Sequence, residues 1–318
     1  NRINIEAGWY TRNNFDLIGL IYTKGTGGQL AKFANVASMK SSGVEFTVST
    51  RNIKTKDFSW NTDFIFSHTK NEVTDLQSNA SVMDMISGNG FAMEGYPVRA
   101  LFSMDFQGLN ENGYPTFINE KGQLTVSDIN FQEQLKKDHL VYEGPTDPTM
   151  TGSLGNIFRY KGFTLNAFIT YSFGNVIRLD PVFHNVYSDL DAMPREFINR
   201  WTTGGDEKVT NVPVIADKRA NQQDPYLSYA YNAYNYSTER IAKGDFIRMK
   251  ELSLSYNFPK KMISRLKVND LSLKIQATNL FLIYSDKKLN GQDPEFFNTG
   301  GVASPVPRQF TLTLRLGI

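Results

Sequence analysis

Apolar and polar residues alternate with a period of two in segments spread along the whole of this 318-residue chain. Only an extended strand turns that period into two distinct faces. In 252–258 the apolar positions Leu252, Leu254, Tyr256 and Phe258 enclose Ser253, Ser255 and Asn257. The same alternation returns in 42–53, 60–67, 163–173, 270–281 and 308–318. The chain is therefore predicted to be all-β, with strands that have one apolar face and one polar, mostly uncharged face.

We expect about nine strands in this chain. They are 1–10, 15–23, 42–53, 60–67, 150–160, 163–173, 244–258, 270–281 and 308–318. A further strand at 97–106 is less regular, and it must be extracellular or belong to a pair. The clearest hairpin joins 150–160 to 163–173, because Lys161-Gly162 suits a two-residue turn.

The connections differ strongly in length, and short and long ones alternate. The short connections are 11–14, 54–57, 161–162 and a helical turn after Pro259, and the long ones are near 24–41, 72–149, 174–243 and 284–307. A short helix is expected around 193–201 and begins at Pro194. Alternation places all short connections at one end of the sheet, as in outer-membrane barrels with short periplasmic turns and long extracellular loops.

Strand parity bears on how much of a barrel this chain contains. Short turns on the periplasmic side make both the first and the last of nine strands run downward. Bacterial single-chain barrels have an even number of strands. We therefore expect 1–318 to be the C-terminal part of one transmembrane β-barrel domain.

Composition removes several classes of protein. The net charge of +2 is too small for a nucleic-acid-binding stripe, and the absence of cysteine excludes disulfides and thiol chemistry. No run reaches the eighteen or so apolar residues of a membrane helix. An aromatic content of 13% suits the girdles of a membrane barrel. A soluble all-β glycan-binding or hydrolase domain remains an alternative.

A barrel assigns a surface to each strand residue. Apolar strand residues are expected to face lipid or the aromatic girdle, and their polar neighbours the lumen. The expected lipid-facing or girdle residues are Trp60, Phe64, Phe66, Leu252, Leu254, Tyr256, Phe258, Phe310, Leu312 and Leu314. Arg248 and Lys250 lie nearer the outer end, where long basic side chains can reach water or lipid headgroups.

Catalytic and metal-binding patterns are absent from the sequence. His68, His139 and His184 lie far apart without partners at metal-ligand spacing, so structural roles are expected. No nucleophile elbow or phosphate-binding loop occurs. Asp189 and Asp191 are a pair that any acidic loop contains. We expect no enzymatic activity, no metal and no cofactor.

A tyrosine-rich run is the best candidate for ligand contact. Its members are Tyr226, Tyr229, Tyr231, Tyr234 and Tyr236. In an extracellular loop such rings can stack on a sugar or line a partner interface, although packing within the loop is the more ordinary role. Arg200 and Trp201 are a candidate substrate clamp, but an anchor for the short helix is favoured.

Several segments together resemble the SusC-like (SusC/RagA-type) TonB-dependent outer-membrane transporters of Bacteroidota. They are 41–52, 95–117, 147–175, 195–207, 244–263, 271–286 and 307–318, which follow family order through the whole chain. The resemblance implies a 22-stranded barrel. It also implies an N-terminal plug, absent from this chain, and a SusD-like surface lipoprotein over the barrel.

The same resemblance implies a function and a location. The expected function is TonB-dependent import of oligosaccharides or oligopeptides across the bacterial outer membrane, as a multi-pass protein in contact with outer-membrane lipid. Energy would come from TonB–ExbB–ExbD through the missing N-terminal part. No nucleic-acid partner is expected. The alternatives are a passive porin-like barrel and the soluble all-β domain, which would stay in solution without detergent.

Overall fold

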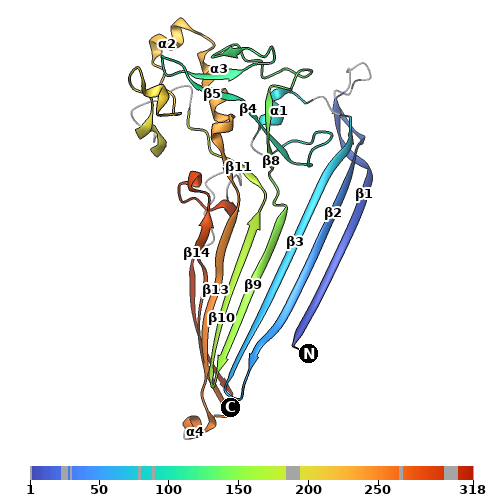
Figure 1. Cartoon of the computed structure of the whole chain (residues 1–318), viewed down its shortest axis with the longest axis vertical. Helices are drawn as coiled ribbons and strands as arrows, with labels where there is room; N and C mark the ends of the chain where they lie inside the picture. The colour runs from blue at the N-terminus through green and yellow to red at the C-terminus, as the bar shows by residue number, and fades with distance from the viewer. Residues whose placement is uncertain are drawn as a thin grey trace.

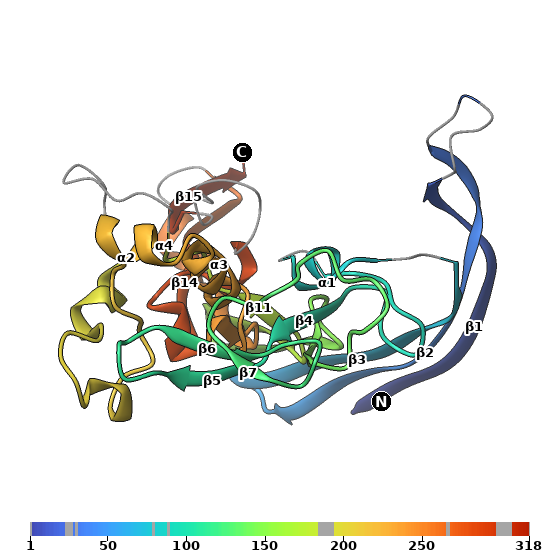
Figure 2. The ribbon, with the colours of Figure 1, turned by 90° about the horizontal axis from the view of Figure 1, so that it is seen from above.

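A curved antiparallel sheet of eight strands dominates the computed structural model, which describes residues 2–22, 28, 31–77, 80–87, 90–183, 194–264, 268–296 and 307–317. We call this sheet the wall (Figure 1). Its strands, in spatial order, are β1 (Ile3–Tyr22), β2 (Ala31–Lys54), β3 (Phe58–Leu76), β9 (Met150–Tyr160), β10 (Phe163–Phe173), β13 (Phe246–Asn257), β14 (Asp270–Ser285) and β15 (Gln309–Gly317). Seen from above, the wall curves from β1 round to β14 and β15 (Figure 2).

Strand register gives the wall one continuous apolar face. Residues directly opposite each other in antiparallel strands point to the same side. One row across the wall contains Ile5, Val48, Phe64, Leu154, Ile169, Met249 and Phe281. A lower row contains Leu165, Leu254, Ile275 and Leu312. The alternation seen in single strands is thus in phase over the sheet.

The opposite face of the wall is largely polar. A row across four strands contains Thr164, Ser255, Lys274 and Thr313. Further along this face, Glu251 accepts hydrogen bonds from Asn166 Nδ2 (3.1 Å) and Ser253 Oγ (3.1 Å), and Lys274 Nζ lies 3.9 Å from its carboxylate. The wall therefore separates an apolar side from a hydrogen-bonding side.

The expectation of nine strands is wrong by one, because β1 continues through the polar segment 11–14. Thr11 to Asn14 pair in register with β2, and the chain passes a bulge near Asp16, which has φ 55°. The expected loop 24–41 is also too long, since β2 already begins at Ala31. With eight strands the first one runs in the opposite direction to the last, so the parity argument for a downward first strand is corrected.

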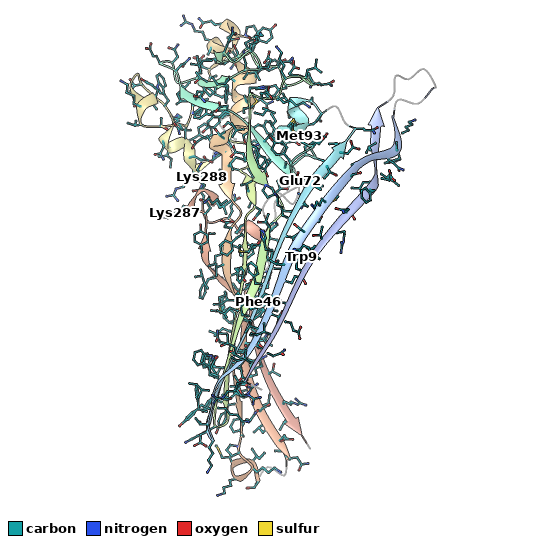
Figure 3. All side chains as sticks on the ribbon, turned by 45° about the vertical axis from the view of Figure 1, so that its right-hand side comes forward. Trp9, Phe46, Glu72, Met93, Lys287 and Lys288 are labelled. Carbon is teal, nitrogen blue, oxygen red and sulfur yellow. The ribbon has the colours of Figure 1, made fainter. Side chains whose placement is uncertain are left out.

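Short and long connections nevertheless collect at opposite ends of the wall, as expected. Residues 55–57, 161–162 and 258–269, which include α4 (Lys260–Ile263), join strands at one end. The connections that follow β1, β3, β10 and β14 leave those strands at the other end. In Figure 3, Trp9 and Phe46 lie about halfway along the wall, whereas Glu72, Met93, Lys287 and Lys288 lie nearer the long connections.

Gly152 permits a tyrosine to cross a neighbouring strand on the apolar face. The ring of Tyr171 on β10 lies over Gly152 on β9, and its hydroxyl donates to the carbonyl oxygen of Ile65 on β3 at 2.9 Å. A Cβ at residue 152 would stand 2.2 Å from that oxygen and 2.3 Å from the tyrosine hydroxyl. One glycine therefore allows a bond that links three strands.

Gly152→Ala should destabilise the folded wall by about 1–3 kcal/mol, because it forces the ring and the strand apart. The measurement is the denaturant midpoint of the folded protein. Gly155→Ala on the same strand is the matched control, since its Cβ would meet nothing closer than 3.5 Å. Equal midpoints for the two variants would contradict the close packing of the Tyr171 ring on Gly152.

The two longest connections fold into a second layer at one end of the wall, which we call the cap (Figure 1). From 80–148 come α1 (Val82–Ile86), β4 (Ala100–Met104), β5 (Phe106–Leu109), β6 (Pro115–Ile118), β7 (Leu124–Thr125) and β8 (Leu140–Pro145). From 175–245 come β11 (Val176–Arg178), η1 (Arg195–Asn199), η2 (Asp206–Lys208), α2 (Lys218–Gln223), α3 (Leu227–Asn235), η3 (Thr238–Arg240) and β12 (Ile241–Lys243). The last connection adds η5 (Lys287–Leu289) and η6 (Pro294–Phe296).

The cap has its own hydrophobic core, so these connections are not the mostly irregular loops expected. Its core joins α1, β4 and β6 from the first connection to η1 and α3 from the second. The doubtful strand at 97–106 is β4, which pairs with β8 outside the wall. The short helix expected around 193–201 is the 3₁₀ helix η1, with Pro194 at its N-cap. Among the described residues, none of the helices has the length and apolar character needed to cross a membrane.

Candidate functional site

The tyrosine-rich run forms helix α3, and its rings divide between the core and the surface of the cap. Tyr231 and Tyr234 are 7% and 1% exposed and pack against Phe183. Burial raises the pKa of the Tyr234 hydroxyl. Tyr236 is half-buried beneath the guanidinium of Arg178, at 5.7 Å. The structure therefore places these three rings inside the cap, in the packing role.

Tyr226 and Tyr229 form an exposed aromatic patch with Phe131. The two tyrosines are 61% and 44% exposed, and their ring centroids lie 5.8 Å apart. Phe131, from the other long connection, meets Tyr229 edge-on at 6.0 Å. Ligand or partner contact stays a prediction for these two tyrosines. We call Phe131, Tyr226 and Tyr229 the aromatic patch.

Trp201 anchors the second long connection onto the first. Its ring lies against Gly113, and its indole N–H donates to Glu207 at 3.1 Å. The backbone N–H of Val214 donates to the Gly113 carbonyl at 3.0 Å. The anchoring role of Trp201 stays a prediction, which these contacts support.

Arg200 lies instead at a shallow polar cleft on the cap. It donates to the Phe197 carbonyl at 3.0 Å and lines a cleft of about 620 Å³ with Lys208, Asn211 and Glu239. Glu239 accepts from Asn211 Nδ2 at 3.2 Å. The structure therefore separates Arg200 from the aromatic patch residues, which do not line this cleft.

Gly113→Ala should loosen the docking of the two connections. Gly113 and Gly122 occupy equivalent turns, with φ 76° and 72°, in which Asn110 and Asn119 accept bonds from the backbone two and four residues later. A Cβ at Gly113 would lie 2.5 Å from the Trp201 ring, whereas one at Gly122 meets nothing within 4 Å. Gly122→Ala thus measures backbone strain alone, about 1–2 kcal/mol.

The expected result is a further loss of about 1–3 kcal/mol for Gly113→Ala over Gly122→Ala. The measurement is the rate of limited proteolysis between residues 195 and 214. Identical rates for the two variants would show that Trp201 does not anchor this segment.

Two buried arginines hold the cap together, and sequence reasoning missed both. Arg178, 4% exposed, donates to the carbonyls of Phe102 (2.6 Å) and Ser237 (3.1 Å) and to Ser103 Oγ (3.2 Å). Burial lowers its pKa to about 10, so it stays charged at neutral pH. Burial also raises the pKa of the nearby Glu143 carboxyl. Three separate segments thus meet at one cation.

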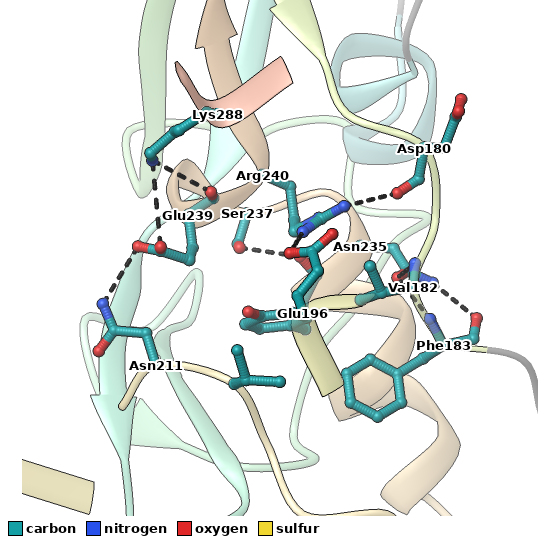
Figure 4. Close-up of polar contacts among 12 residues, drawn as sticks. Asp180, Val182, Phe183, Glu196, Asn211, Asn235, Ser237, Glu239, Arg240 and Lys288 are labelled. Carbon is teal, nitrogen blue, oxygen red and sulfur yellow. Dashed lines mark hydrogen bonds and ion pairs between the residues drawn. The ribbon is translucent and has the colours of Figure 1, made fainter. Parts of the chain in front are cut away.

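Arg240 makes the second buried network, with Glu196 and the Asp180 carbonyl, the latter at 2.7 Å (Figure 4). Beside it, the amide of Asn235 accepts from the backbone of Val182 and Phe183 and donates to the Phe183 carbonyl (Figure 4). A sequence signal exists for Arg178, since it lies within the short apolar stretch 176–179 of a supposed loop, whereas Arg240 follows the polar residues 237–239. Solvated loop arginines have no need of such neighbours.

A third buried arginine, Arg248, joins the last connection to the wall, and its surroundings differ from those expected. Arg248 on β13 is 5% exposed, whereas water or lipid headgroups were expected around it. It forms an ion pair with Asp293, and Glu295 Oε2 lies 3.2 Å from Nε without hydrogen-bond geometry. Lys250 lies 4.0 Å from Glu295. The last connection is therefore tied to the wall by charge.

A cavity lies where the wall meets the cap, and we call it the junction cavity. Its volume is about 640 Å³. The wall contributes Thr151, Ser153, Thr170 and Ser172, and the cap and last connection contribute Arg99, Asn175 and Glu295. Concave sites with a few converging polar groups are where ligands usually bind. This cavity and the aromatic patch are the candidate functional sites.

The expected lipid-facing and girdle residues lie on the apolar face or beside it. Trp60 stacks on Phe158 with ring centroids 5.6 Å apart, and Phe66 pairs with Phe46. Tyr256 packs on Phe163 and on Phe258, which follows β13. Phe310, Leu312 and Leu314 on β15 are 74%, 69% and 59% exposed. Their contact with lipid remains a prediction.

Titratable groups show no catalytic arrangement in the described part of the chain. No group of three or more His, Cys, Asp or Glu side chains there is placed to hold a metal ion. His68 lies on β3 opposite Val44. His139 is in the cap, where burial lowers its pKa. His184, Asp189 and Asp191 lie outside the described residues.

Comparisons with known proteins find TonB-dependent receptors that are similar over nearly the whole chain. TonB-dependent receptor P3 of Formosa agariphila is 23% identical over 309 residues, which cover 93% of this chain and 29% of that protein. TonB-dependent receptor SusC of Bacteroides thetaiotaomicron is 25% identical over 326 residues, or 97% of this chain and 29% of that protein. No protein-family model matches the sequence.

The fold agrees with the sequence relatives. The structure of the RagAB peptide transporter matches with a TM-score of 0.75 at 21% identity, covering 99% of this chain and 33% of that one. Its 'open-open' state matches with a TM-score of 0.74. The chain thus spans about a third of the length of the relatives it matches. None of these names denotes an enzyme, in agreement with the expectation from the sequence.

Proposed function

We propose that this chain, which is similar to the SusC-like TonB-dependent receptors, forms the C-terminal wall and cap of a barrel that imports oligosaccharides or oligopeptides across the bacterial outer membrane. One observation carries the proposal: the apolar positions of the wall are in register across its strands and make one continuous face. Such a face suits lipid on one side of a barrel, with the polar face lining the lumen.

The cap fits the outer side of such a barrel. It lies at the end of the wall with the long connections, and long loops are extracellular in these proteins. The wall and cap would act as parts of one barrel domain over 1–318, with the plug and further strands outside this chain. TonB–ExbB–ExbD would supply energy through that other part. No chemical change to the substrate is proposed.

A SusD-like surface lipoprotein is the proposed partner above the cap. One structural neighbour is described as the RagAB peptide transporter. On this chain the aromatic patch supports a partner contact, because exposed aromatic rings are enriched at protein interfaces. Tyr226→Ala with Tyr229→Ala should reduce lipoprotein co-purification about tenfold or more, which is the effect of truncating an aromatic hot spot of an interface. Leu124→Ala, an exposed cap residue outside the patch, is the control.

The function is tested with the full-length receptor in its own bacterium. Deleting it should abolish uptake of its substrate, and so should deleting TonB, while a passive porin would keep its uptake without TonB. The protein should fractionate with the outer membrane, need detergent for extraction and change gel mobility on heating. Recovery in the aqueous fraction without detergent would favour the soluble all-β alternative.

A further inference from the structure

The wall side of the junction cavity carries four hydroxyl groups on the polar face. They belong to two cross-strand pairs, Thr170 opposite Ser153 and Ser172 opposite Thr151. Directly opposed residues of antiparallel strands lie about 5 Å apart, and successive pairs on one face about 7 Å. The hydroxyls therefore form a compact hydrogen-bonding platform on β9 and β10.

Two of these hydroxyls belong to largely buried residues and are not bonded to the protein. Ser153 and Ser172 are 8% and 7% exposed, and neither hydroxyl makes a hydrogen bond to another residue of the described chain. Their oxygen atoms are not fully enclosed, so they remain open to the cavity that both residues line. A ligand in the cavity can therefore pair with both hydroxyls.

Asn175 adds a polar group that is buried and unpaired. It lines the cavity, and its Oδ1 is buried without a hydrogen-bond partner among the described residues. Its Nδ2 makes only a long contact of 3.5 Å to the Thr146 carbonyl. The hydroxyls can donate or accept, while an amide oxygen accepts. The cavity thus offers both donors and acceptors to a ligand.

Charges of both signs lie on the cavity lining. Lys250 and Glu295, each 39% exposed in its side chain, stand 4.0 Å apart. Arg99 is paired with Asp147 at 2.7 Å and also lines the cavity. A ligand that carries both an ammonium and a carboxylate group would meet a partner for each.

Aromatic rings of the lining are unsuited to stacking on a sugar. Phe246 is 9% exposed, and the guanidinium of Arg248 lies 5.5 Å from its ring centroid. Tyr171 crosses the apolar face of the wall, where its hydroxyl is bonded to Ile65. Sugar sites ordinarily use an open aromatic face. The observations therefore favour a peptide over a glycan.

We propose that the junction cavity is a subsite for an oligopeptide, whose main-chain amides pair with Ser153, Ser172 and Asn175 and whose charged ends or side chains meet Lys250 and Glu295. This inference rests on the proposed import function. The proposed subsite lies on the import path, between the cap and the lumen face of the wall.

Cysteine protection tests the subsite directly, because this chain contains no cysteine. The full-length receptor with Ser172→Cys is labelled with a thiol reagent, alone, with a tryptic digest of casein, and with maltoheptaose. The digest should slow labelling at residue 172 at least several-fold, while Ser255→Cys, on the same face outside the cavity, should label at one rate throughout. Protection by maltoheptaose alone, or no labelling in any state because another part of the protein fills the cavity, would overturn the proposal.

Affinity measurement adds a second readout. Ser153→Ala with Ser172→Ala should weaken binding of the casein peptides about tenfold or more, the effect of losing two hydrogen bonds. Ser255→Ala should bind as the wild type does. If the wild type imports peptides and the double variant binds them equally well, the subsite is wrong and the import function stands. If the wild type neither binds nor imports peptides but takes up glycans, this inference fails and the import function survives.

Discussion

Leu254→Arg should prevent stable assembly of the receptor in the outer membrane, while Ser255→Arg should assemble normally. Leu254 is 46% exposed on the apolar face, between Leu165 and Ile275. An arginine on the lipid face costs about 2–4 kcal/mol near the membrane midplane, which is a large part of the stability of a typical protein domain. The measurement is the fraction of receptor that shows heat-modifiable gel mobility in outer-membrane preparations.

Ser255 makes this a matched comparison, since it is the next residue on the same strand but faces Thr164 and Lys274 on the polar side. The two substitutions introduce the same side chain at almost the same height. Loss of assembly in both variants would show that strand 246–257 does not separate lipid from lumen, and equal tolerance would have the same meaning.

Arg178→Met should unfold the cap while the wall stays assembled. The substitution keeps most of the volume but leaves Ser103 Oγ and the carbonyls of Phe102 and Ser237 without their donor in a buried site. Breaking a buried charged network in this way costs about 3–5 kcal/mol. Limited proteolysis should cut the cap much faster than in the wild type, and heat-modifiable mobility should be unchanged.

Two further variants test whether loss of the Arg178 network is the cause of the faster proteolysis of the cap. Arg99→Met removes an arginine whose side chain is 48% exposed and paired with the half-exposed Asp147, so it should cost less than about 1 kcal/mol. Adding Glu143→Gln to Arg178→Met should restore part of the protease resistance, because it removes the buried carboxylate left without its cation. A cap as resistant in Arg178→Met as in Arg99→Met would contradict the role of the network.

Alternation predicted the wall well because membrane strands must separate two solvents. The strands expected at 150–160 and 163–173 have those bounds in the structure, and their hairpin is confirmed. The short connection expected at 11–14 was wrong for a related reason, which is the limited height of the apolar band. Beyond an apolar band both faces of a strand meet water, so Thr11 to Asn14 can be polar on both sides and still pair with β2.

The cap was harder to predict, because its short elements are stabilised by contacts between distant segments. Strands of two to six residues, such as β7 and β8, contain too few positions to show a period. Helix α3 did carry a signal that was passed over. Leu227, Ala230, Tyr231 and Tyr234 follow helical spacing and are buried, while Tyr226 and Tyr229 fall outside that stripe and are exposed. Of the two buried arginines of the cap, only Arg178 had apolar neighbours to indicate it.

The unequal lengths of the wall strands affect how neighbouring surface polymers can approach the outer end of the protein. Strand β2 has 24 residues and β15 has nine, which correspond to about 80 Å and 30 Å of extended chain. An apolar band of about 25 Å accounts for a small part of the longer strand. In the proposed orientation the rim is oblique, high at β1–β3, which have 19 to 24 residues, and lower at the other five strands, which have nine to 16. The cap rises over the lower part of the rim, where its connections join β9, β10 and β13. The high side therefore stands beside the cap and screens it from neighbouring surface polymers (Figure 1).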